Sequence, residues 1–164
     1  MITDWAEWLG NSALSNYIQE DPTAFPILEV LHVVAIALVV GSIFIVDLRL
    51  LNLCSKTYRV SRLLKAVLPM TGIAFTFAVI TGFLMFASQP VRYLHTTPFL
   101  LKMGLLVLAG ANMLLFHAWT HRGITKWDDG DAIPRAARVA GLVSLILWVA
   151  ILFAGRFVGF LLAF

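Results

Sequence analysis

Residues 26–50 read PILEVLHVVAIALVVGSIFIVDLRL, and this stretch decides the fold. About 20 consecutive apolar residues are enough to cross the hydrocarbon core of a bilayer as an α-helix. The stretch nevertheless carries Glu29 and His32 near its start. An ionisable side chain inside a membrane span is costly and by default marks a functional site. The segment therefore predicts a transmembrane helix with a site near one end of it.

The whole chain has the composition of a membrane protein. Of its 164 residues, 60% are hydrophobic and 13% are charged, whereas soluble domains have roughly 45–50% apolar and about 25% charged residues. After the first span, at about 27–47, apolar segments follow at about 67–88, 98–119 and 138–163. We expect an all-α integral membrane protein, with a four-transmembrane-helix bundle over residues 26–164.

Residues 1–25 form a separate N-terminal segment. Trp5, Trp8, Leu9 and Tyr17 fall near one helical face. Gly10, Asn11 and Pro22 limit the length of the helix. We expect one short amphipathic helix that lies in the membrane interface, where tryptophan anchors such elements. The alternative is an aromatic extension of the first span.

Charge in the connecting segments predicts the orientation. Most of the basic residues lie in segments 48–66 and 120–137. Segment 89–97 has Arg92 as its only Lys or Arg, and the N-terminal segment is acidic. The positive-inside rule then places both termini in the periplasm of a bacterial inner (plasma) membrane. The basic residues behind the net charge of +3 cluster between the spans, where they set the orientation in the membrane. We therefore expect no nucleic-acid partner. The single cysteine, Cys54, excludes a disulfide framework and a covalent haem-attachment motif.

Ionisable and polar residues gather at two depths in the predicted bundle. The outer level holds Glu29, His32, Arg92, His95, Lys102 and Arg156. The inner level holds Asp47, Arg49, Asn112, His117 and His121. At a rise of about 1.5 Å per residue, roughly 20 Å separates His32 from His117, so these two cannot be opposite ligands of one haem.

Glu29 and His32 are three residues apart and are therefore neighbours on a helix. We expect Glu29 to orient the imidazole and leave its other nitrogen free, as carboxylates do for metal-ligating histidines. The alternative for His32 is a buried imidazole bonded to Glu29 or to a neighbouring helix. The alternatives are a solvated loop histidine for His95 and an ion pair with Glu29 for Arg156.

Three segments resemble known membrane families. LHVVAIALVVGSIF (31–44), RVSRLLKAVLPMTGIAFTFAVITGFLMF (59–86) and TTPFLLKMGLLVLAGANMLLFH (96–117) are similar to the copper-resistance-D-like family. That family has an LH pair early in one span, an R-x-x-R element before the next, a TG pair near its end and a TP…LLK opening of another. The pattern also resembles HemJ-type protoporphyrinogen oxidases, and its closest match is an uncharacterised branch of small four-span proteins, a domain of unknown function. The last span matches mainly through AGRF (154–157).

The resemblance implies haem b as the cofactor, with copper as the rival. His32 matches the first-span histidine and Lys102 the third-helix lysine. In this hypothesis His32 ligates iron, and His95 is the candidate second ligand. Lys102, Arg156 and Arg92 would neutralise the propionates. Copper is disfavoured because the five methionines are scattered rather than gathered in an outer tract.

A second, weaker metal or haem site could form at the inner level. His117 and His121 are four residues apart, and Met70 lies at a matching depth. The alternative is that His121 only caps the end of its helix, where the helix dipole favours a positive charge.

We therefore expect a haem b-binding electron-transfer protein that uses quinol or a periplasmic redox partner, and hence an oxidoreductase or electron carrier if haem is bound. The alternatives are a HemJ-like oxidase, a copper or small-solute transport protein, and an accessory structural subunit without cofactor. Membrane lipid is a partner in every case. Glycine-rich spans also allow a homo-oligomer.

Overall fold

The structure, a computed structural model, describes residues 2–54, 59–120, 124 and 133–162. Its long helices are α3 (Ala24–Leu50), α4 (Val60–Ser88), α6 (Thr97–Leu115) and α8 (Arg135–Leu162). All four are long and apolar enough to cross a membrane, α6 together with the residues that follow it. These helices confirm the expected four-helix membrane bundle.

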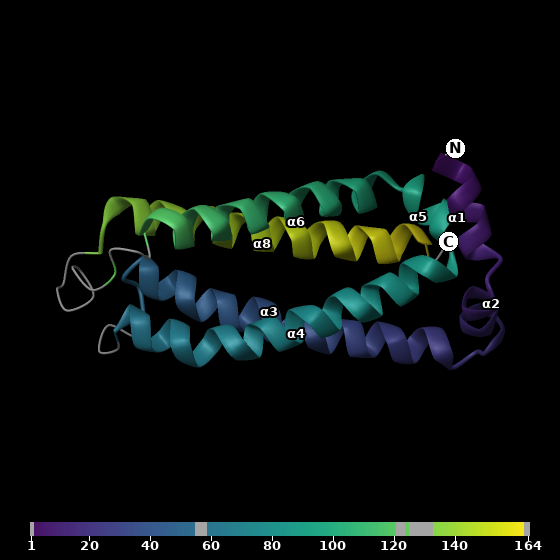
Figure 1. Ribbon diagram of the computed structural model, residues 1–164, viewed down its shortest axis with the longest axis horizontal. Coiled ribbons are helices and arrows are strands. Elements are labelled where there is room, and N and C mark those ends of the chain that lie inside the picture. Colours follow the sequence, from purple (N-terminus) through teal and green to yellow (C-terminus); the bar gives the residue numbers. More distant parts are fainter. Residues whose placement is uncertain (1, 55–58, 121–123, 125–132, 163–164) are drawn as a thin grey trace.

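The bundle consists of two helical hairpins (Figure 1). Helix α3 packs along α4, α6 packs along α8, and the hairpins meet chiefly where α3 contacts α8. The N-terminal helices and the end of α8 lie at one end of the bundle, called here the outer end. The end of α3, the start of α4, the end of α6 and the start of α8 lie at the opposite, inner end. Consecutive spans therefore run in opposite directions, as expected for a chain that crosses a membrane four times.

The helices extend past the apolar segments that predict them. Helix α4 begins at Val60, so the basic residues Arg62 and Lys65 lie in its first turns rather than in a loop. Helix α6 ends at Leu115 and continues as a π-helical turn, η1 (Phe116–Thr120). Helix α3 ends at Leu50, and two residues later Asn52 has a positive φ of 62°, in the left-handed region. The N–H groups of Asn52 and Leu53 bond the carbonyls of Arg49 and Leu48, which closes the helix end as a Schellman motif.

The N-terminal segment forms two helices, so the expectation of one helix is wrong. Helix α1 (Ile2–Gly10) and helix α2 (Ala13–Glu20) are separated at Asn11 and Ser12. The Ser12 hydroxyl accepts the Ser15 N–H at 3.2 Å and caps α2. The buried Ser15 hydroxyl donates to the Ser88 carbonyl at the end of α4, at 3.0 Å. The segment is therefore attached to the outer end of the bundle as well as carrying exposed tryptophans.

An aromatic cluster joins this segment to the spans and to the short helix α5 (Pro90–Leu94). Phe86 stacks on Phe99 with ring centroids 5.5 Å apart. Tyr93 meets both rings edge-on, at 5.9 and 5.3 Å, and Trp5 lies 6.2 Å from Phe86. The cluster of Trp5, Phe86, Tyr93 and Phe99 thus ties α1, α4, α5 and α6 together at the outer end.

Candidate functional site at the outer end of the bundle

His32 of α3 makes its polar contact with the neighbouring span. Its Nδ1 lies 2.9 Å from the Thr81 hydroxyl of α4. Thr81 gives its single hydroxyl proton to the Phe77 carbonyl, at 2.8 Å. With that proton given to Phe77, the imidazole is the donor to Thr81, through Nδ1–H. The backbone of Ala78 also hydrogen-bonds the ring. The contact with Thr81 does not involve Nε2, which is the nitrogen that a ligand would use.

Gly82 makes room for this imidazole. A Cβ added at Gly82 would lie 2.8 Å from His32 Cε1, closer than real contacts permit. The ring thus lies against the backbone of α4, and any larger residue at position 82 would require the imidazole to shift. Thr81 and Gly82 together hold the imidazole, one by hydrogen bonding and the other by shape.

Lys102 of α6 reaches the same level from the other hairpin. Its Nζ lies 3.8 Å from the position that a Cβ on Gly155 of α8 would occupy. Its charge is also close enough to interact with the His32 ring. We call His32, Thr81, Gly82, Lys102 and Gly155 the outer cluster. All four spans contribute to it.

Two predicted members of the site are placed outside the outer cluster. Glu29 is exposed, and the hydrogen-bond partner of His32 Nδ1 is Thr81. The expected orienting role therefore belongs to Thr81, on the neighbouring helix. Arg156 is also exposed, because adjacent helical residues point about 100° apart and Gly155 faces Lys102.

His95 and Arg92 lie beyond the spans at the outer end. His95 is exposed at the end of α5, and its Nδ1 lies 2.9 Å from the Val91 carbonyl of its own helix. Arg92 is exposed and donates to Gln89 at 3.0 Å. Neither side chain is brought into contact with the His32 ring.

The inner site does not gather its predicted ligands in the described residues. His117 lies in η1, and its Nδ1 is 2.9 Å from the Met113 carbonyl. Met70 is 49% exposed on α4. His121 lies outside the described residues. In the part of the chain that the structure describes, no three His, Cys, Asp or Glu side chains come together in a group that could hold a metal ion.

Charge and burial act together on Tyr93, which lies just outside the spans. Burial raises the pKa of Tyr93 to about 12, and the negative charge of Glu29 acts in the same direction. Glu29 therefore influences the aromatic cluster, although it does not bond His32.

In the sequence, Thr81 and Gly82 stand out only as the TG pair of the family pattern and as a packing position. The register of the α3–α4 hairpin carries the missing signal. Ser42 lies ten residues after His32, and its partner Thr71 lies ten residues before Thr81. The Ser42 and Thr71 hydroxyls are 2.7 Å apart. Two polar pairs at matched spacing are what an antiparallel helix pair produces, so this pattern could have located Thr81.

Comparison with known proteins gives one match. The model of a family of unknown function (DUF6644) matches residues 6–161. No curated protein and no solved structure matches the chain.

Proposed function

The chain belongs to the DUF6644 family of unknown function, and we propose that it binds haem b at the outer cluster and transfers electrons in the bacterial inner membrane. The observation that carries the proposal is the geometry of His32. Its Nδ1 is held by the Thr81 hydroxyl, and Nε2 lies outside that hydrogen bond. Ligating histidines usually donate their second ring N–H to a protein acceptor in this way.

The residues of the outer cluster have the chemistry to hold a haem. Nε2 of His32 would bind the iron, and the bond between Nδ1 and Thr81 would orient the ring. Lys102 is a nearby cation that could pair with a propionate. When bound, haem b supplies a one-electron redox couple. The protein would hold the imidazole, offset the negative charge of the propionates and keep the site in apolar surroundings.

The aromatic cluster supports this location. Phe86 lies four residues beyond Gly82, and Phe99 lies three residues before Lys102. The aromatic cluster therefore lies about one helical turn beyond the outer cluster, on its outer side. A low-dielectric cover of this kind influences the redox potential of a metal site. Quinol or a periplasmic redox protein is the expected electron partner.

Absorption spectroscopy of the purified full-length chain tests the proposal. We expect a Soret band that shifts on reduction with dithionite, and a pyridine haemochrome typical of haem b. His32→Ala should abolish the band, whereas the matched variant His117→Ala should retain it. Thr81→Val should weaken haem binding by about 10- to 100-fold, the range found when groups that orient a metal ligand are removed.

Other outcomes identify the rival functions. His95→Ala tests the second predicted ligand, and we expect it to retain the band because its ring is exposed and bonded to α5. A colourless preparation that retains stoichiometric copper would favour copper handling. A colourless, metal-free preparation from haem-replete cells would reject a cofactor role for His32.

A further inference from the structure

A buried carboxyl lies near the inner end of α3, far from the outer cluster. Asp47 is 4% exposed. Among the residues that the structure describes, its Oδ2 is buried and has no hydrogen-bond partner. At about 1.5 Å per residue, roughly 22 Å of helix separates Asp47 from His32. Asp47 therefore belongs to a different site.

The neighbours of Asp47 are mainly apolar or neutral. Ser144 of α8 hydrogen-bonds to its carboxyl group. Gly141, one turn earlier on α8, brings the two backbones close together, because a Cβ there would lie 3.2 Å from the Asp47 carbonyl oxygen and 3.1 Å from Leu50 Cβ. The group is thus enclosed between α3 and α8.

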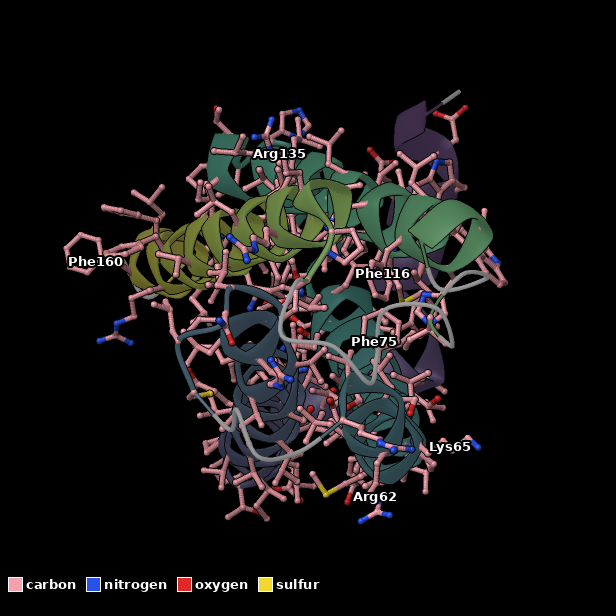
Figure 2. All side chains as sticks on the ribbon, turned by 90° about the vertical axis from the view of Figure 1, so that its left-hand side faces the viewer. Arg62, Lys65, Phe75, Phe116, Arg135 and Phe160 are labelled. Atoms are coloured by element: carbon pink, nitrogen blue, oxygen red, sulfur yellow. The ribbon has the colours of Figure 1, made fainter. Side chains whose placement is uncertain are left out.

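A hydrophobic cluster lies around this position at the inner end. Val46 and Leu50, on either side of Asp47, belong to it, together with Val60, Leu64, Phe116, Ile124, Ile133 and Ala137. Figure 2, viewed toward the inner end, shows Phe116 among the helices while Arg62, Lys65 and Arg135 lie toward the periphery. The part of α3 that carries Asp47 therefore lies in an apolar region of the inner end, with these three cations toward its periphery.

The cations on the helices packed against Asp47 either contact other groups or are exposed. Arg49, two positions along α3, is buried and directs its Nη1 to Asn52 at 3.4 Å. The remaining cations of α4 and α8 at this end are exposed: Arg62, Lys65, Arg135 and Arg138. A carboxylate buried with an unbonded oxygen is strongly disfavoured, whereas the protonated acid is neutral and can donate from that oxygen.

We propose that Asp47 is a proton-binding site of the inner half of the bundle, which is protonated at neutral pH and exchanges its proton with the aqueous phase. The ligand is a proton, and Ser144 is the positioning residue that bonds the carboxyl. The proposal is independent of haem binding, because none of the residues that carry it belongs to the outer cluster.

Infrared spectroscopy of the full-length chain in lipid nanodiscs tests this site. We expect a carbonyl-stretch band from a protonated carboxylic acid at neutral pH, which shifts to lower frequency after transfer to D₂O. Asp47→Asn should abolish the band. Asp21→Asn is the control and should leave it unchanged, because hydrogen bonds from Thr23 lower the pKa of Asp21 and keep it ionised.

Ser144→Ala provides a second readout if Asp47→Asn does not fold. Loss of one hydrogen bond to the carboxyl should move the acid band without removing it. The proposal is overturned if wild-type protein has no such band, if the band persists in Asp47→Asn or is unmoved in Ser144→Ala, or if it does not respond to D₂O. Because the measurement needs no cofactor, a haem-free preparation gives the same answer.

Discussion

At the scale of single residues, the hydrogen-bond direction at His32 has the greatest functional weight. A threonine in a helix commonly donates its proton to a carbonyl of the preceding turn, which leaves only its lone pairs for other partners. Thr81 does so. This local property of α4 favours the His32 tautomer that carries its proton on Nδ1.

Gly82→Ala should displace the His32 ring. The new methyl group would lie 2.8 Å from Cε1, and overpacking of this kind typically costs about 1–3 kcal/mol. Thermal unfolding in detergent, followed by circular dichroism, measures the change. Gly104→Ala is the matched control, because a Cβ there meets nothing within 4 Å. Equal stability of the two variants would contradict the packing described for the ring.

Tyr93 should titrate far above an ordinary tyrosine, whose pKa is about 10. The tyrosinate absorbance lost on Tyr93→Phe substitution should appear in wild-type protein only near pH 12, because burial raises its pKa. In Glu29→Gln the same signal should appear at lower pH, since a negative charge that favours the protonated form has been removed. A midpoint near 10 in folded wild-type protein would show that Tyr93 is not buried.

At the scale of helices, the close contact between α3 and α8 depends on Gly141. Gly141→Ala should destabilise the bundle by about 1–3 kcal/mol, because its Cβ would press on Leu50 and on the backbone of Asp47. Gly159→Ala, on the same helix, meets nothing within 4 Å. We expect it to be neutral or to stabilise the helix, since alanine is the better helix former. Unfolding in mixed detergent micelles compares the two, and a larger loss in Gly159→Ala would contradict this contact.

The sequence predicts the four spans well because each is a long apolar run. It predicts the ends poorly: basic residues such as Arg62 extend α4 beyond its apolar part, and Asn11 with Ser12 divides the N-terminal segment. For the outer cluster, depth alone brings His32 and Lys102 to one level. Depth does not specify the direction in which a side chain points. Arg156 and Glu29 therefore share the predicted outer level with His32, although both are exposed. The pairing of His32 with Thr81 requires the register of the hairpin, which a single helix does not contain.

At the scale of the whole molecule, the basic inner end predicts the orientation in the membrane. In a Cys54→Ser background, Trp8→Cys should react with a membrane-impermeant maleimide in cells with a permeabilised outer membrane. Arg62→Cys should react only after the inner membrane is opened. Residue 8 is 74% exposed and residue 62 is also exposed, so access and not burial decides the result. The reverse labelling pattern would place the basic end outside, against the positive-inside rule.

The division into two hairpins has a consequence for assembly. His32 and Thr81 belong to the first hairpin, whereas Lys102 and Gly155 belong to the second. The outer cluster is therefore created by the association of two halves that are joined in the chain only through the short stretch 89–96. A ligand that contacts both hairpins would stabilise the associated hairpins by mass action. Two separately expressed halves, 1–95 and 96–164, should therefore associate more tightly when that ligand is present than when it is absent.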